Sequence, residues 1–223
     1  MLQSQEKILK VFFNANAELF DDVALISPVP WFHQLICLNG KVDVSFTGWF
    51  QFAKVTHQNI SFTSITCGQG TRIVDALLAL QGIVKHVVML GLAGSLDESL
   101  GIGEVASPDF ADHMELEPMY PRSELAPDLS FARASRVLTL DGLLLEDRVL
   151  LSRAASLGFQ LIDIETYYFF KYASTLYKSW QAILTVTDLP LSKPFYTIDF
   201  KADELETPVS RILQSLGCYR SPK

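Results

Sequence analysis

From residue 60 to the C-terminus, apolar runs typical of buried strands alternate with amphipathic runs of helical period. Such alternation builds a parallel or mixed sheet covered by helices. We therefore predict an α/β fold: a sandwich with a central mixed, mainly parallel twisted sheet flanked by helices. The predicted strands, with the turns that follow them, are 60–71, 86–96, 134–142, 160–167 and 181–188, and the predicted helices are 72–82, 145–158, 169–180 and 203–217.

The first third of the chain has a different pattern. Residues 4–19 are predicted to form a short amphipathic helix, and 22–29 a buried strand that stops at Pro28. Residues 41–55 alternate apolar and polar side chains, which favours antiparallel strands. No linker or repeat divides the 223 residues, so 1–223 is predicted to be one domain, with 1–20 as an N-terminal helical extension.

Composition narrows the range of partners. The net charge is −7, and no run of Lys or Arg is long enough to follow a phosphate backbone, so nucleic acid is not an expected partner. No stretch reaches the roughly 20 apolar residues that span a membrane. The three cysteines, Cys37, Cys67 and Cys218, are far apart and form no CxxC, so we expect neither a disulfide framework nor a zinc site. We also expect no other metal and no cofactor. Free cysteines favour a reducing, cytoplasmic location.

Ligands of open α/β sheets bind beyond the carboxyl ends of the strands. The five ends are the segments 66–70, 90–95, 139–144, 162–166 and 185–190; the first two are glycine-containing turns, and the other three carry Asp or Glu. Each feature alone has an ordinary structural interpretation: the GxG at 68–70 as a tight turn, GLAG at 91–94 as close backbone packing, and Asp188 as an N-cap. Their order along the chain is more specific.

In this order, the segments resemble the purine nucleoside phosphorylase superfamily, in its nucleosidase branch. The resemblance rests on GLAGSLDESLGIGEV (91–105), TLDGLL (139–144), DIET (163–166) and TVTD (185–188), and it covers about residues 60–200. That branch includes 5′-methylthioadenosine/S-adenosylhomocysteine nucleosidase and futalosine hydrolase. The segment DFADHMELE (109–117) is more similar to the futalosine hydrolase type.

The resemblance implies roles for the acids. Glu165 is expected to accept hydrogen bonds from the ribose hydroxyls and to stabilise positive charge at the anomeric carbon. Ile164 is expected to pack against the substrate, and Asp163 to be a structural hydrogen-bond acceptor. Asp188 is the expected general acid, because burial allows a carboxyl group to keep its proton near neutral pH. Thr187 is expected to orient Asp188.

The resemblance also implies a binding surface. Ala93 and Gly94, from GLAG, are expected to line the substrate site. Leu143 and Leu144 fall where the family surrounds the purine, although the wall is usually Phe, so Leu143 removes a stacking surface. Phe195 either replaces that surface or belongs to the core.

Two features bear on the nucleophile. Phosphorylase members hold phosphate with an arginine where this chain has Met89 and Leu90, and a buried phosphate without a cation is costly, which favours hydrolysis. The family's water-activating glutamate is not matched in ISPVPWFHQLI (26–36), which contains no acid. His33 is one candidate base, against the ordinary interpretation of a surface or core histidine.

Two alternatives to His33 stay open. In the first, the segment 107–128, which is predicted to be an irregular exposed loop, closes over the site and supplies an acid such as Glu115 or Glu117. In the second, the protein binds a nucleoside and hydrolyses it slowly or not at all.

The predicted activity is hydrolysis of a 5′-substituted purine nucleoside to free base and modified ribose. The favoured substrates are futalosine or aminodeoxyfutalosine, intermediates of menaquinone synthesis, with methylthioadenosine or S-adenosylhomocysteine as alternatives. A non-catalytic or weakly active nucleoside-binding relative is the competing hypothesis. The family further implies a homodimer.

Overall fold

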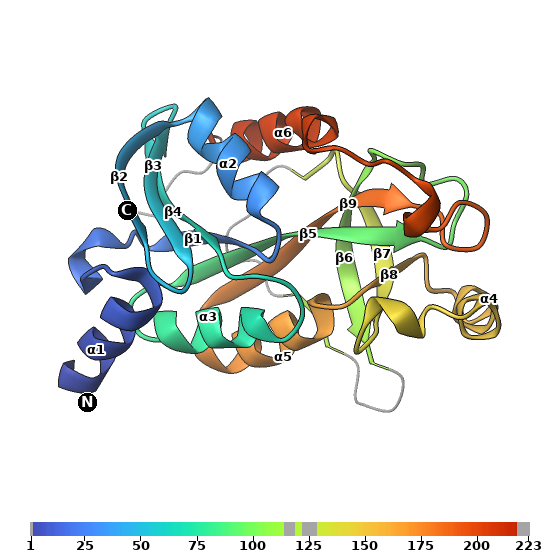
Figure 1. Ribbon diagram of the computed structural model, residues 1–223, viewed down its shortest axis with the longest axis horizontal. Helices are drawn as coiled ribbons and strands as arrows, with labels where there is room; N and C mark the ends of the chain where they lie inside the picture. The colour runs from blue at the N-terminus through green and yellow to red at the C-terminus, as the bar shows by residue number, and fades with distance from the viewer. Residues whose placement is uncertain (1, 114–118, 122–128, 218–223) are drawn as a thin grey trace.

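The computed structural model describes residues 2–113, 119–121 and 129–217 (Figure 1). The strands are β1 (Val23–Ser27), β2 (Lys41–Thr47), β3 (Gln51–His57), β4 (Ile60–Thr66), β5 (His86–Ser95), β6 (Val105–Asp112), β7 (Arg133–Thr139), β8 (Leu161–Asp163) and β9 (Ser179–Asp188). The helices are α1 (Leu2–Phe13), α2 (Pro30–Asn39), α3 (Arg72–Leu80), α4 (Arg148–Ser156), α5 (Thr166–Leu176) and α6 (Glu206–Gly217). Four short 3₁₀ turns join them, of which Leu143–Leu145 and Phe195–Thr197 lie near the site.

All nine strands belong to one mixed sheet, in the order β2-β3-β4-β1-β5-β8-β7-β6-β9. The pairs β4–β1, β1–β5 and β5–β9 are parallel, and so are β6–β7 and β7–β8. The strands β2, β3 and β4 form an antiparallel meander, and the pairs β5–β8 and β6–β9 are also antiparallel. The predicted fold class is confirmed, and so are the antiparallel strands predicted within 41–55.

One part of the sheet closes on itself. β9 pairs with β6 at one edge and also with β5, so β5, β9, β6, β7 and β8 form a ring of strands. The sequence pattern did not predict this closure, because periodicity identifies strands but not their partners. Its consequence is that the carboxyl ends of β5, β8 and β9 come together.

Helices cover both faces of the sheet. In Figure 1, α2 and α6 lie on one face, and α3 and α5 lie on the other. Two large clusters of buried side chains match these layers: one includes Leu77, Phe169 and Phe170 from α3 and α5, and the other includes Phe32, Ile36 and Ile212 from α2 and α6. α1 joins the first cluster through Leu9 and Phe13, so the N-terminal segment packs on the core.

Several local predictions were wrong. GLAG (91–94) is not a turn, because β5 continues through it to Ser95. The segment 107–128 is not wholly irregular, since β6 extends to Asp112; residues 114–118 and 122–128, with Glu115 and Glu117, lie outside the described residues. Helix α2 was not predicted, although Pro30 at its first turn is a common helix start.

The strand predicted over 160–167 is shorter than expected. β8 ends at Asp163, and Glu165 is the N-cap residue of α5. The acid-x-acid motif therefore lies at a strand-to-helix junction rather than within a strand. The predicted division into one domain, with 1–20 as an extension, stays a prediction. No helix in the described part of the chain is long and apolar enough to cross a membrane.

Candidate active site

A cavity of about 160 Å³ lies at the carboxyl ends of β5, β8 and β9. It brings together eight of the ten residues that the sequence predicted for the site. They are Ala93, Gly94, Leu143, Ile164, Glu165, Thr187, Asp188 and Phe195. The structure also adds lining residues that were not predicted for the site: Val29, Gln69, Leu92, Glu146, Ile162 and Asp163.

Glu165 is held in the cavity wall by the GxG turn. Only 4% of Glu165 is exposed, and its Oε1 accepts a hydrogen bond of 2.7 Å from the backbone N–H of Gly70. Gly70 has a φ of +68° and Gly68 a φ of +87°, a conformation that glycine adopts at little cost. The turn therefore positions the glutamate through its backbone. Burial, and then the nearby Asp163, raise the pKa of Glu165 to about 8.

Asp163 has the structural role expected of it. Its Oδ1 accepts a hydrogen bond of 2.6 Å from the Thr139 hydroxyl, and its Oδ2 accepts from the backbone N–H of Thr166 at 2.8 Å and from the Thr166 hydroxyl. These bonds join the end of β7 to the start of α5. Burial raises the pKa of Asp163, and the hydrogen bonds oppose that shift.

Asp188 ends β9 with one oxygen bonded and one unbonded. Its Oδ1 lies 3.1 Å from the Thr187 hydroxyl, which is also 3.4 Å from the carbonyl oxygen of Ala93. Its Oδ2 is buried and has no hydrogen-bond partner among the described residues. A buried polar atom without a partner in a cavity wall indicates a ligand position. Burial raises the pKa of Asp188, as expected for a general acid at neutral pH.

Gly94 is needed for the position of Asp188. A Cβ on Gly94 would lie 2.5 Å from Cγ of Pro190 and 3.2 Å from Oδ1 of Asp188. Since the proline ring cannot rotate away, a larger residue would displace the segment that follows Asp188. The small residue in GLAG therefore permits the close approach of β5 and β9, which are paired at this point.

Glu146 is an acid of the cavity that was not predicted as a site residue. It follows the 3₁₀ turn Leu143–Leu145 and precedes Asp147, the N-cap of α4, whose carboxylate accepts from the N–H groups of Val149 and Leu150. Burial and the charge of Asp188 raise the pKa of Glu146 to about 7. No sequence signal indicated this proximity, because residues 145–158 were interpreted as one helix.

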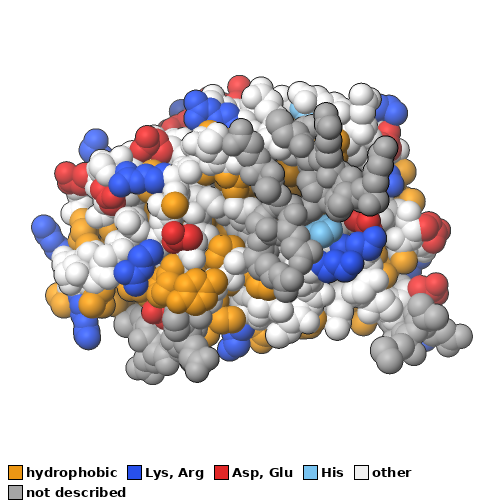
Figure 2. Space-filling model, turned by 180° about the vertical axis from the view of Figure 1, so that it is seen from behind, with side chains coloured by type: hydrophobic (Ala, Val, Ile, Leu, Met, Phe, Trp, Pro, Cys, Tyr) orange, Lys and Arg blue, Asp and Glu red, His pale blue; other side chains and the backbone are white. Residues whose placement is uncertain are grey.

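A second cavity, of about 370 Å³, adjoins the first one. Leu143, Glu146 and Phe195 line both cavities. Leu144 lines only the second, and 96% of its surface is exposed. Leu145, Val149 and Leu157, which follow it in the chain, are also exposed. Figure 2 shows the molecule from behind, with hydrophobic side chains at several places on that surface. The smaller cavity alone is below the ~300–1,000 Å³ of ordinary small-molecule sites, and only with its neighbour does the space reach that range.

His33 lies outside both cavities. It is buried in α2, and its Nδ1 is 2.9 Å from the Ser64 hydroxyl oxygen. Burial lowers its pKa to about 4. The cavity wall on the β1 side consists of Val29, which is apolar. The prediction that His33 activates water thus gains no support from the geometry and stays a prediction.

The cavity lining described here contains no Lys, Arg or His. Arg72, the cation nearest to the GxG turn in sequence, packs with its Cδ beside Gly68 and does not line the cavity. No group of three or more His, Cys, Asp or Glu that could hold a metal ion occurs among the described residues. The chemical groups that this cavity offers are therefore carboxyls, one hydroxyl, one amide and apolar side chains.

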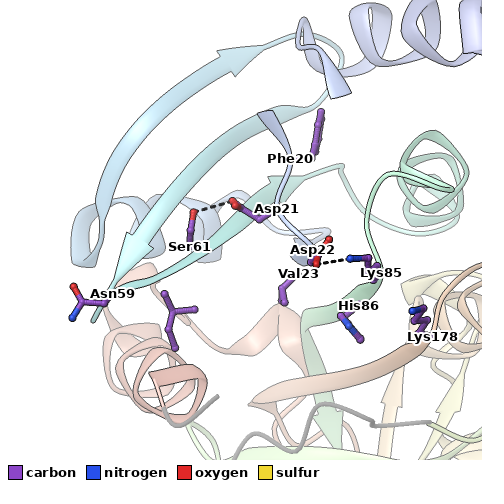
Figure 3. A pocket seen from close by; sticks show the side chains of 10 residues that line it. Phe20, Asp21, Asp22, Val23, Asn59, Ser61, Lys85, His86 and Lys178 are labelled. Carbon is purple, nitrogen blue, oxygen red and sulfur yellow. Dashed lines mark hydrogen bonds and ion pairs between the residues drawn. The ribbon is translucent and has the colours of Figure 1, made fainter. Parts of the chain in front are cut away.

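A larger, open groove of about 770 Å³ lies at the opposite ends of the strands. Figure 3 shows that both acids of the groove are bonded: Asp21 accepts a hydrogen bond from Ser61, and Asp22 forms an ion pair with Lys85 at 2.7 Å. Asp21 also pairs with Lys54 at 3.0 Å. This groove is larger than the first cavity, but its acids already have partners.

The comparisons with known proteins agree with this geometry at the level of the fold. The chain is similar to 5′-methylthioadenosine/S-adenosyl homocysteine nucleosidase of Campylobacter jejuni, with a TM-score of 0.72 and 12% identity, covering 88% of this chain and 98% of that one. It is similar to uridine phosphorylase of Vibrio fischeri, with a TM-score of 0.76 and 17% identity, covering 90% and 93%. It is also similar to purine nucleoside phosphorylase of Toxoplasma gondii in complex with immucillin-H, with a TM-score of 0.76 and 18% identity, covering 92% of each chain.

No protein-family model matches the sequence, and no curated protein matches it. The fold is that of an α/β protein, and the cavity lies at the carboxyl edge of its sheet. More particularly, the chain has the fold of the nucleoside phosphorylase and nucleosidase superfamily, as the sequence motifs predicted.

Proposed function

We propose that this chain is an N-glycosidase, which hydrolyses the C1′–N9 bond of a 5′-substituted purine nucleoside to a free base and a modified ribose. The observation that carries the proposal is the meeting of Glu165 and Asp188 in one cavity whose described lining has no cation. Two carboxyls suit a reaction in which positive charge builds on a sugar carbon while a base leaves. Without a cation, phosphate is a poor nucleophile for this site and water is a better one.

In this proposal Asp188 acts on the purine base, and Glu165 binds the ribose. Asp188 donates its proton to N7 of the purine as the C1′–N9 bond breaks and the electron pair moves onto the base. Thr187 and Gly94 position Asp188 for this step. A water molecule then adds to C1′, and the proton that it releases restores the acid at Asp188.

Glu165 binds the ribose. Its carboxylate accepts hydrogen bonds from the 2′- and 3′-hydroxyls and stabilises the positive charge at C1′. In the folded chain its raised pKa favours the protonated form. Hydroxyl donors favour the ionised form, so substrate binding lowers the pKa and releases a proton. Ile164 and Ala93 supply apolar contacts, and Leu143 with Phe195 borders the base.

For the 5′ substituent we favour futalosine or aminodeoxyfutalosine, within menaquinone synthesis, over methylthioadenosine or S-adenosylhomocysteine. The support is the segment 109–117, of which residues 114–117 lie outside the described residues. We further propose a homodimer in the cytoplasm. Light scattering after size-exclusion chromatography measures the first of these, and a monomer at all concentrations contradicts it.

The experiment is a measurement of free-base release by the purified chain. The substrates are methylthioadenosine, S-adenosylhomocysteine, aminodeoxyfutalosine, futalosine and inosine, each with and without phosphate. We expect release that does not need phosphate and that is much slower in Glu165→Gln and in Asp188→Asn. Release only with phosphate contradicts hydrolysis, and unchanged binding and turnover in Glu165→Gln contradict the site.

A second function is favoured by the apolar wall at Val29 and by the position of His33 outside the cavity. With no base for water among the described lining residues on that side, the chain is a nucleoside-binding protein of low or no turnover. Binding of a nucleoside without base release supports this second function. We place this second function after hydrolysis, because departure of the base in an oxocarbenium-like transition state needs little help from the nucleophile.

A further inference from the structure

We infer that the outer cavity, the one of about 370 Å³, binds an uncharged apolar group carried by the six-membered ring of the leaving base, such as an alkyl or arylmethyl group on the 6-amino group of adenine. The inference deepens the proposed function and rests on it for the orientation of the substrate. Its basis is that the outer cavity is mainly apolar and is continuous with the inner cavity of about 160 Å³, since Leu143, Glu146 and Phe195 line both.

The proposed orientation of a nucleoside directs its base toward the outer cavity. Glu165, assigned to the ribose, and Asp188, assigned to N7 of the purine, line only the inner cavity. N7 and N9 both belong to the five-membered ring of a purine, so the six-membered ring lies farther from the ribose. A base held in this way extends its six-membered ring toward Leu143 and Phe195, which lie at the border of the two cavities.

The lining of the outer cavity suits an apolar group without charge. Eight of its ten lining residues are Leu, Pro, Phe or Tyr. The two charged ones, Glu146 and Arg148, have opposite signs, so the described lining has no net charge to attract an ionic group. A site of this kind gains affinity mainly by removing apolar surface from water.

Two segments that line the outer cavity are held in place by local hydrogen bonds. Pro190 and Leu191 lie in a turn that two backbone hydrogen bonds between Leu189 and Lys193 close, at 3.0 and 2.6 Å. The segment that carries Arg148 begins at Asp147, whose carboxylate caps α4. The cavity is therefore largely formed before a ligand binds, as is usual for small-molecule sites.

Some apolar side chains of the outer cavity are left in water by the free chain. Leu144 is 96% exposed and Tyr196 is 76% exposed, whereas Leu151, which lines the same cavity, is 2% exposed. An unsubstituted base reaches the residues at the border of the two cavities and leaves Leu144 and Tyr196 uncovered. An apolar group on the base covers them, and the burial of their surface stabilises the complex.

The test measures binding of free adenine and free 6-benzylaminopurine to the full chain by calorimetry. The wild type is expected to bind 6-benzylaminopurine at least about tenfold more tightly, because even one methylene in an apolar pocket is worth about tenfold or more. Leu144→Ser and Tyr196→Ser change mostly exposed side chains, so the fold is expected to persist. Each variant is expected to lose several-fold more affinity for 6-benzylaminopurine than for adenine.

The matched control is Leu157→Ser, a change of the same type at a leucine that is 58% exposed and lines neither cavity. It is expected to behave as the wild type. Equal affinities of the wild type for the two bases overturn the inference, and so does a wild type that binds neither base. An unchanged preference in both Leu144→Ser and Tyr196→Ser also overturns it, because the group then lies outside the outer cavity.

Base release from methylthioadenosine, measured separately, decides the proposed function. A chain that releases adenine but binds the two free bases equally refutes only the inference. A chain that prefers 6-benzylaminopurine, loses that preference in the two variants and releases no base refutes only the glycosidase, and the outer cavity keeps its assignment.

Discussion

At the N-terminal ends of β1 and β5, Asp21 and Asp22 each have a lysine partner, whereas at the carboxyl ends Asp188 and Glu146 face a cavity with no cation in its described lining. The first region is the larger groove, and both of its acids already have partners (Figure 3). The second is smaller, and it holds carboxyls whose pKa values burial has raised. Size therefore does not distinguish a site here; unbalanced, buried, titratable groups do.

The largest effect is expected for Asp188→Asn, which tests whether the cavity at the carboxyl ends of the strands carries the activity. We expect base release to fall by about 10²–10⁴, because the amide cannot supply a proton to the leaving base. The unfolding temperature should stay close to that of the wild type, since Oδ2 of Asp188 has no partner in the described structure to lose. Single-turnover kinetics and thermal unfolding measure the two effects. Full activity in this variant would remove the acid from the mechanism.

Gly94→Ala tests position without changing the chemistry. The added Cβ would be 2.5 Å from Pro190 Cγ, so Pro190 and the adjoining Asp188 must shift. A displacement of about 1 Å at a reacting group costs on the order of 100-fold in rate, and we expect kcat to fall more than KM rises. Gly142→Ala is the control, because nothing lies within 4 Å of a Cβ built there. Equal effects of the two variants would refute the positioning role.

The pH dependence of stability tests whether burial in the cavity raises the pKa of Glu165. Glu165 has its ordinary pKa of 4.5 in the unfolded chain and about 8 in the folded one, so the folded state binds the proton more tightly. The stability from this group is fully present below pH 4.5 and is lost as the pH rises through about 8. We expect the unfolding temperature to fall over this range in the wild type, and to fall less in Glu165→Gln. Parallel curves for the two proteins would contradict the raised pKa.

The smallest effect is expected in the paired groove. Lys85→Met removes the partner of Asp22 from an exposed ion pair, and such pairs contribute less than about 1 kcal/mol. Base release should not change. Chemical denaturation and the base-release assay check both expectations. A large loss of activity in this variant would show that the groove takes part in the function and that pairing is not a reliable guide.

Most residues that line the cavity could be predicted from the sequence because their motifs are local. Glu165, Asp188 and Gly94 each lie in a short segment with a recognisable neighbour, and the end of a strand is where a ligand is expected. The role of the GxG turn was harder to foresee, since Gly70 donates to a glutamate 95 positions away. Glu146 was missed for a related reason: its interaction with Asp188 depends on where the turn before α4 lies against β9.

By itself the sequence determined the α/β class, most of the strands and helices, and the two acids proposed for the reaction. Periodicity and turn residues depend on only a few consecutive positions, so they can be identified in the sequence. Only the tertiary structure decided that β9 pairs with both β5 and β6 to close the ring, that GLAG lies inside a strand, and that His33 is outside the cavity. These depend on packing between distant segments, and the raised pKa values follow from the same burial.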